Sequence, residues 1–322
     1  RDWLYPLSLN PLAQDRLEVG VYNRVRIQCM GEIIKTWIND KPAACLIDRA
    51  DASGFIALQV HSIGKASMAG KRIWWKNIRI RTGHFEPLPF PASIYAVNTV
   101  PNMLTFFEKA GGWKLLFDGK SSGGWKGAYK NEFPAKGWEI KDGILAVLPS
   151  DGAESTNGGD IVTTAQFSAF DLSFEFKLTP GANSGVKYFV TLAENNSGSA
   201  IGLEYQLLDD TLHPDAKLGR DGNRTLASLY DLIKAEKQTR FIHQPGEWNW
   251  GRIVVYPNNH VEHYLNGIKV LEYDRGSAAF RELVAISKYK VWPNFGEAPK
   301  GHILLQDHGN AVQFRSIKIK EL

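Results

Sequence analysis

Apolar and polar residues alternate with a period of two over most of the chain after residue 112, and this alternation predicts β-strands. In FDLSFEFKL (170–178), one face of an extended chain would carry Leu172, Phe174, Phe176 and Leu178. Similar short segments follow one another, and Asp-Gly or Asn-Gly pairs such as Asp142-Gly143 separate several of them. Such pairs favour tight hairpin turns. The pattern therefore predicts an all-β sandwich, or jelly roll, over residues 113–322.

Two stretches depart from this alternation and have a helical pattern instead. Residues 102–109 form a short candidate helix that Gly111 and Gly112 would end. The segment LASLYDLIKAE (226–236) is a second candidate helix. Because residues 83–112 are rich in proline, we expect them to form a linker that contains the first of these helices.

An internal repeat relates the two ends of the chain. Residues 22–44 resemble residues 248–271, with one extra residue in the second turn of the later copy. The aligned pairs include Asn23 with Asn249, Arg26 with Arg252, and Asn39 with Asn266. Two further matches follow in the same order: 54–61 with 301–308, and 72–81 with 312–320. Residues 1–82 are therefore expected to be the back half of a jelly-roll module whose complete copy spans residues 113–322.

Half of a sandwich would leave strand edges unpaired and an apolar face uncovered. The repeat therefore predicts either that the chain is the tail of a longer protein or that the missing strands come from elsewhere. The alternative is that the first half-module packs on the second as an extra sheet.

Composition narrows the class of protein. The 322 residues carry a formal net charge of +4, and their Lys and Arg residues are scattered, so no footprint for nucleic acid is expected. No run of about 18 apolar residues occurs, so no membrane span is expected. The two cysteines, Cys29 and Cys45, fall on candidate strands that a third strand separates, which argues against a disulfide.

Polar residues gather on the predicted non-core face of several strands. Glu204 and Gln206 share one face of GLEYQLLD, and Lys187 points outward from the strand before it. On GHILLQDH, Gln306 and His308 fall on the same side if Ile303 and Leu305 are in the core. These residue types suit a sugar site, and Glu or His can transfer protons. A solvated strand face is the simpler alternative.

Familiar catalytic motifs are missing from the sequence. It contains no GxSxG elbow, HExxH pair, P-loop or dinucleotide fingerprint. Sandwich-type β-glucanases supply two carboxylates from a Glu-x-Asp-x-x-Glu strand, whereas this chain offers Glu204-x-Gln206-x-x-Asp209. An amide therefore stands where the second carboxylate belongs, which weakens a plain glycosidase reading.

Five segments of the second copy, taken in order, resemble the 3-keto-disaccharide hydrolase family. They are GWKLLFDGKSSGGWKG, GDIVT, GANSGVKYFV, GLEYQLLDD with HPDA, and GHILLQDHGNAVQFRSIKIKEL. The resemblance covers residues 112–322, and the first copy is similar to the back half of the same domain. It implies a concanavalin-like jelly roll, a sugar already oxidised to a ketone at C3, and a periplasmic or secreted setting.

The chemistry that the resemblance implies needs one base rather than two carboxylates. A C3 ketone acidifies the C2 proton, and its removal lets the C1 oxygen leave by elimination, after which water can add. We expect Glu204 or His308 to be the base or acid and Lys187 to stabilise the oxyanion. The residues expected to orient or support the sugar are Gln206, Asn183, Gln306, Asp209 and Asp160.

Other readings stay open at the level of sequence. Trp125 is a candidate sugar platform, and a place in the core or at its rim is the alternative. No cofactor is expected, although a divalent ion around Glu204, Asp209 and His308 is an alternative. The expected partner is an oligosaccharide or glycoside. The rival functions are a carbohydrate-binding module without catalysis and a conventional glycoside hydrolase, which would cleave sugars that are not oxidised.

Overall fold

The computed structural model describes residues 4, 7, 10–60, 69–91, 94, 96–150, 154–192 and 200–322. The chain divides into two compact units, which we call the N-terminal unit (Asn10–Thr99) and the C-terminal unit (Val100–Leu322). Within the described part, no helix is both long and apolar enough to cross a bilayer.

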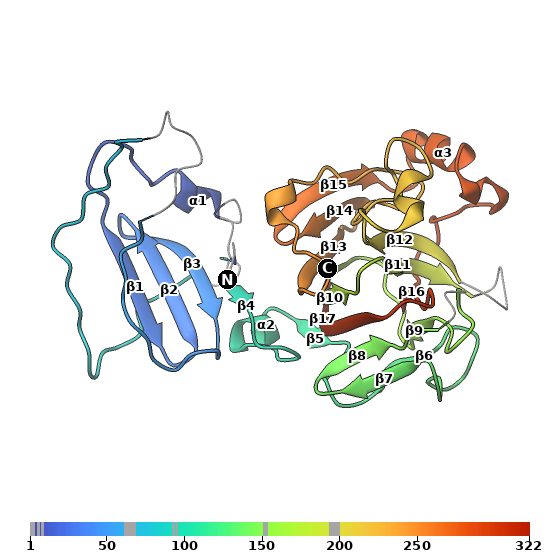
Figure 1. Ribbon diagram of the computed structural model, residues 1–322, viewed down its shortest axis with the longest axis horizontal. Coiled ribbons are helices and arrows are strands. Elements are labelled where there is room, and N and C mark those ends of the chain that lie inside the picture. Colours follow the sequence, from blue (N-terminus) through green and yellow to red (C-terminus); the bar gives the residue numbers. More distant parts are fainter. Residues whose placement is uncertain are drawn as a thin grey trace. The chain divides into compact units, whose positions relative to one another are not determined.

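The C-terminal unit is a sandwich of two antiparallel sheets (Figure 1). The larger sheet has the order β15-β14-β13-β10-β17-β8-β7, with β5 also paired to β17. Its strands are β5 (Trp113–Leu115), β7 (Trp138–Lys141), β8 (Ile144–Val147), β10 (Phe170–Leu178), β13 (Asn249–Val255), β14 (His260–Leu265), β15 (Ile268–Asp274) and β17 (Val312–Glu321). The predicted all-β sandwich is confirmed.

The smaller sheet is the one that carries the candidate site. Its order is β12-β11-β16-β9-β6. Its strands are β6 (Trp125–Gly127), β9 (Ile161–Thr163), β11 (Asn183–Thr191), β12 (Ile201–Leu208) and β16 (His302–Leu305). One face of each sheet fills the core, to which β10 contributes Leu172, Phe174 and Phe176, all buried. The other face of the smaller sheet is therefore free to carry polar side chains.

Helices are few and short in the C-terminal unit. They are α2 (Phe106–Ala110), α3 (Ala278–Ala285) and the 3₁₀ helices η3 (Pro214–Lys217), η4 (Thr239–Phe241) and η5 (Lys288–Val291). The prediction of a helix from residue 102 was wrong at its start, because Asn102 has a left-handed φ of 52°. Helix α2 begins instead after Thr105, which forms a reciprocal capping box with Glu108, and it ends at Gly111 as expected.

The predicted helix over residues 226–236 is also wrong. This segment is a loop of turns beside β12, and Ala227 and Asp231 have φ values of 64° and 61°. Its backbone forms turns and also pairs with β12: the Tyr230 N–H donates to the carbonyl oxygen of Glu204 over 3.0 Å. Leu226 and Leu229 are buried in the core. Tertiary burial and pairing with β12 therefore override the helical propensity of this sequence.

The N-terminal unit contains a helical turn and one four-stranded sheet. Helix α1 (Pro11–Gln14) precedes the sheet, whose order is β1-β2-β3-β4. The strands are β1 (Val25–Met30), β2 (Ile33–Ile38), β3 (Lys41–Ile47) and β4 (Ala96–Asn98), and β4 pairs parallel to β3. Strand β4 lies within the segment that was expected to be a linker. Because β2 separates Cys29 from Cys45, both thiols are free, as predicted.

The repeat is visible in the hydrogen bonds of the two units. In the N-terminal unit, Asn39 Nδ2 donates to Asn23 Oδ1 over 2.8 Å, and Asn266 Nδ2 donates to Asn249 Oδ1 over the same distance in the C-terminal unit. Residues 54–60 and 72–81, which the repeat would make strands like β16 and β17, form no strand. Strands β16 and β17 pair with β11, β9, β10, β8 and β5, and the described N-terminal unit has no counterparts of these five.

Candidate active site

Strand register places the predicted polar residues on one face of the smaller sheet. Lys187 on β11 lies opposite Glu204 on β12, and Gly185 lies opposite Gln206. On the other side of β11, Lys187 lies opposite Leu304 of β16. All of these residues are buried or nearly so, although they lie on the non-core face. The face is thus covered rather than solvated, which counts against the simpler alternative left by the sequence.

Glu204 occupies the centre of this site, and a glycine makes room for it. A Cβ atom added to Gly185 would lie 2.5 Å from Glu204 Oε1, which is closer than any side chain tolerates. The Lys187 ammonium lies 3.9 Å from Glu204 Oε2. With its amide nitrogen turned toward the acceptors, Gln206 donates to Glu204 Oε1 over 3.0 Å. Gln206, which stands where a glycosidase would have its second carboxylate, therefore holds the Glu204 carboxylate in place.

The surroundings raise the pKa of Glu204 above its ordinary value. Burial of the carboxylate is the largest cause, and the charges of Lys187 and Lys288 oppose it. The carboxylate of Glu154 raises this pKa further. A carboxylate with a raised pKa that still has cations nearby is a stronger base than an exposed one, which suits proton abstraction.

His308 lies at one end of the same face. Its Nε2 is 3.3 Å from the Asn183 side-chain nitrogen, and the Asn183 side chain is 3.2 Å from the Gln206 amide. The side chains of four predicted site residues therefore lie next to one another in the order Glu204, Gln206, Asn183 and His308. A second imidazole, His213, lies edge-on to His308 with 6.2 Å between the ring centroids. Burial and then the charge of His308 lower the pKa of His213.

Gln306 borders the site from β16. Its Nε2 donates to Glu154 Oε1 over 2.9 Å, whereas its buried Oε1 has no partner within the described part of the chain. A buried amide oxygen without a partner is unusual and is available to a water or a hydroxyl group. Asp160 is less directly placed: its Oδ1 accepts the Asp307 N–H over 3.0 Å and ties the strand end to the loop after residue 154.

Two predicted site residues serve the framework. Asp209 accepts N–H groups from Gly181, Thr211 and Leu212 at the end of β12; burial raises its pKa, but these three bonds lower it more, and the net pKa is below the ordinary value. Trp125 is buried in the core, and its indole N–H donates to the carbonyl oxygen of Leu116 over 2.6 Å. This places Trp125 in the core alternative, because its ring offers no free face for a sugar.

The loop beside β12 supplies residues that the sequence did not single out. Tyr230 donates its hydroxyl to Asp215 Oδ2 over 2.7 Å, and Arg224 bonds both Asp215 and Asp231 over 2.9 and 2.7 Å. The Lys288 ammonium lies 4.1 Å from the centroid of the Tyr230 ring. No pattern in the sequence marked these residues, because the loop was taken for a helix and Lys288 lies in an irregular segment.

The predicted alternative of a divalent ion finds no cluster of ligand atoms among the described residues. Among the described residues, the ligand atoms of Glu204, Asp209 and His308 do not cluster. Three potential ligands converge elsewhere: His260, Glu262 and Glu272, on the larger sheet. The Lys269 ammonium already bonds both glutamates of that trio, so an ion pair network accounts for their approach.

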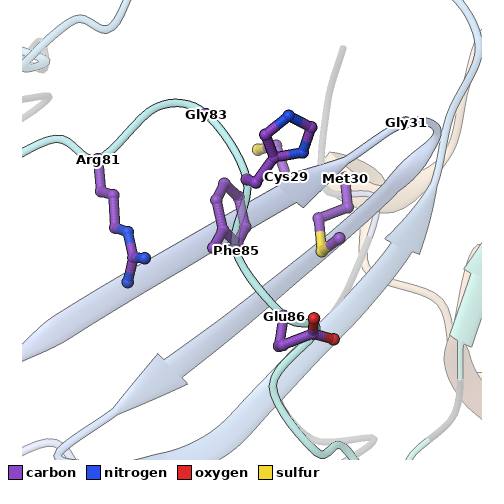
Figure 2. Close-up of a pocket in the computed structure, with 8 residues that line it drawn as sticks. Cys29, Met30, Gly31, Arg81, Gly83, Phe85 and Glu86 are labelled. Carbon is purple, nitrogen blue, oxygen red and sulfur yellow. The ribbon is translucent and has the colours of Figure 1, made fainter.

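The N-terminal unit has a hollow of about 550 Å³ between β1 and the segment 81–86. Figure 2 shows its charged residues, Arg81 and Glu86, on either side of Phe85. Both charged side chains are exposed, and the neighbouring Cys29 thiol is exposed too. The buried, mutually bonded polar groups of the C-terminal unit make a better candidate site.

Fold and site together define an all-β sandwich with a buried carboxylate on the non-core face of one sheet. The chain belongs to the family described as the 3-keto-alpha-glucoside-1,2-lyase-like domain, whose model matches residues 3–81 and 112–320. The resemblance noted in the sequence is thereby confirmed.

Two relatives are similar to this chain over most of their own length. It is 39% identical over 235 residues to a protein of Bacteroides thetaiotaomicron named 3-keto-disaccharide hydrolase, covering 66% of this chain and 79% of that protein. A crystal structure of a candidate glycosyl hydrolase from Parabacteroides distasonis is 32% identical, with a TM-score of 0.59. This match covers 69% of the present chain and all of the other.

Proposed function

We propose that the chain cleaves 3-keto-glycosides, including 3-keto-disaccharides. Membership of the family and the name of the B. thetaiotaomicron relative support this substrate class. The observation that carries the proposal is the environment of Glu204: one buried carboxylate of raised pKa, with a lysine on one side and an amide where a glycosidase would keep its second acid. Such a site suits a reaction that needs a single base.

The proposed reaction begins with proton transfer. Glu204 takes the C2 proton, and the electron pair moves through C2 and C3 onto the ketone oxygen to give an enolate. The enolate then collapses: the C3 ketone re-forms, a C1–C2 double bond forms, and the C1–O bond breaks. The leaving oxygen takes a proton from an acid. Addition of water across C1–C2 completes a net hydrolysis, whereas release before this step is a lyase outcome.

The remaining residues have roles that follow from their contacts. Lys187 keeps Glu204 ionised despite its burial, because the two groups lie 3.9 Å apart. Gln206 fixes the carboxylate in position. His308, at the end of the Gln206–Asn183 series, is the candidate acid for the leaving oxygen. The free Oε1 of Gln306 can accept a sugar hydroxyl.

The test is a comparison of oxidised and ordinary substrates. The wild-type protein should release the aglycone from a 3-keto-glucoside, and Glu204→Gln should slow this release by about 10²- to 10⁴-fold, as expected on loss of a general base. Glu132→Gln, an exposed position, is the matched control. Cleavage of the ordinary glucoside at a similar rate would favour a conventional glycosidase. Binding without turnover, unaffected by Glu204→Gln, would favour a carbohydrate-binding module.

A further inference from the structure

A second lysine, Lys288, packs on the loop that pairs with β12, whereas Lys187 lies on β11, the strand that pairs with β12 on its other edge. The Tyr230 N–H bonds the Glu204 carbonyl oxygen, so the loop that carries Tyr230 runs beside β12 at the level of Glu204. The Lys288 ammonium is 4.1 Å from the centroid of the Tyr230 ring and 5.1 Å from that of Tyr289. Its charge reaches the site, because it contributes to lowering the pKa of Glu204 against the effect of burial.

The backbone of Lys288 is held firmly. Its N–H donates to Asp231 Oδ2 over 2.8 Å, and the other oxygen of Asp231 accepts from Arg224 Nε over 2.7 Å. Ser287 caps the 3₁₀ helix η5 at the same point by accepting the Tyr289 N–H. Asp231 has a left-handed φ of 61°, which costs energy for a residue other than glycine. The fold therefore sustains an unfavourable backbone at the residue that positions Lys288.

The Lys288 ammonium differs from that of Lys187 in its partners. Lys187 is buried, donates to the carbonyl oxygen of Ala200 over 3.3 Å and pairs with Glu204. Within the described residues, Lys288 forms no ion pair or side-chain hydrogen bond, and its side chain is still accessible to solvent. Two tyrosine rings lie beside the cation, and an N–H group that does not face a ring is available to a ligand.

We propose that Lys288, rather than Lys187, binds the C3 oxygen of the substrate and stabilises the enolate. This inference rests on the proposed function. As Glu204 takes the C2 proton, one unit of negative charge moves to the C3 oxygen, and the Lys288 ammonium receives it. When the enolate collapses, the ketone re-forms and the same N–H groups remain bonded to a neutral oxygen. No net electron transfer or further reactant is involved.

The experiment compares three variants on a 3-keto-glucoside. Lys288→Met should lower kcat by about 10²- to 10³-fold, the usual cost of losing an oxyanion donor, with a much smaller change in KM. Lys288→Arg should recover part of kcat, because it keeps the charge. Lys290→Met, which removes an exposed lysine from the same 3₁₀ helix, is the matched control and should behave as wild type. The melting temperatures of the three variants should agree with that of the wild type.

A second measurement separates enolate formation from the later steps. In D₂O, the C2 proton of the 3-keto-glucoside exchanges for deuterium when the enolate forms and returns, and NMR follows this exchange. Lys288→Met should slow both exchange and cleavage. If Lys288 had only a structural role, its loss would change KM at least as much as these two rates. If exchange and kcat in Lys288→Met equalled those of the wild type, the proposed role of Lys288 would be overturned and the proposed function would stand. A wild-type protein that neither exchanges nor cleaves the substrate would overturn the proposed function and this inference with it.

Discussion

At the scale of single residues, the site depends on how Glu204 is balanced between burial and charge. Burial alone would protonate the carboxylate and remove the base, whereas exposure would make it too weak. Lys187 at 3.9 Å and the Gln206 amide at 3.0 Å stabilise the ionised form, while burial keeps the net pKa raised. The acidic limb of the profile of activity against pH is therefore expected to follow the ionisation of Glu204.

Removal of the Lys187 charge tests that balance. In Lys187→Met, the cation that lowers the Glu204 pKa is lost, so this pKa rises further. Because the base must be ionised, the acidic limb of kcat/KM against pH should move to higher pH. Lys120→Met, at an exposed position, should leave the profile in place. If the acidic limb did not move in Lys187→Met, Lys187 would not act through the ionisation of Glu204.

Gly185 is expected to be essential for a steric reason. An alanine Cβ there would lie 2.5 Å from Glu204 Oε1 and would displace the carboxylate. A displacement of about 1 Å in a reacting group can cost about 10²-fold in rate, so Gly185→Ala should lower kcat/KM by about that factor. Gly123→Ala is the control, because its Cβ would meet only Ser121 Oγ at 3.4 Å. Equal activity in both variants would contradict the geometry of the site.

At the scale of elements, the position of the loop beside β12 depends on a buried histidine of β14. His263 lies between the sheets, where its Nδ1 is 3.0 Å from the carbonyl oxygen of Ala227 and its Nε2 is 2.8 Å from the Tyr188 hydroxyl. The Tyr188 hydroxyl is also 2.7 Å from that of Tyr273. A neutral imidazole that donates from Nδ1 and accepts at Nε2 satisfies all of these groups. The loop that brings Tyr230 to the site is thus anchored to the core.

Because His263 is buried, the free energy of unfolding is expected to depend on pH. Burial lowers the pKa of His263 to about 4, from an ordinary value of 6.5. Between these values the unfolded chain binds a proton that the folded chain excludes, so the free energy of unfolding falls as the pH drops from 6.5 to 4. The loss is of the order of 3 kcal/mol.

Chemical denaturation of the wild type at several pH values measures this loss. His263→Gln should be less stable at pH 7 and should show a shallower dependence on pH, because it has no titrating group there. His260→Gln, on the same strand but partly exposed, should keep the slope of the wild type. The same slope in His263→Gln would mean that other groups cause the dependence.

At the scale of the whole molecule, the two units contain the same meander in different surroundings. In the C-terminal unit, Arg252 on β13 pairs with Asp171 of the neighbouring β10 through two bonds of 2.7 Å. Its counterpart Arg26 lies on β1, at the edge of its sheet, and is exposed. Ile27 is likewise exposed, whereas its counterpart Ile253 is buried. The prediction that further strands complete the N-terminal unit stays a prediction, and these residues show what such strands would cover.

Amide hydrogen exchange should reveal the difference between the units. The outer edge of β1 pairs with no described strand, whereas β13 is bonded on both sides. If nothing else covers β1, its amides should exchange at least about tenfold faster than those of β13, because opening an edge strand costs less free energy. Mass spectrometry of peptides from residues 22–44 and 248–271 measures this. Equal protection would show that another segment already covers β1.

The predicted architecture held where local pattern and tertiary packing agree. The alternation in FDLSFEFKL and the Asp142-Gly143 turn specify a strand and a hairpin through short-range geometry, and both are present. The segment 226–236 failed because its backbone bonds to β12, which no local pattern records. In the site, the strand faces carrying Glu204 and Lys187 were predictable from the period-two alternation, but the position of Lys288 was not.

The sequence by itself determined the class of fold, the repeated meander and the polar face around Glu204, because a period of two assigns side chains to faces without knowledge of the partner strand. Only the tertiary structure decided that this face is covered, that Gly185 makes room for the carboxylate, and that Lys187 and the loop that holds Lys288 flank β12. The reason is physical. Burial and charge at one atom depend on every element packed around it, and the segments that carry residues 185, 204 and 288 come together only when the chain has folded.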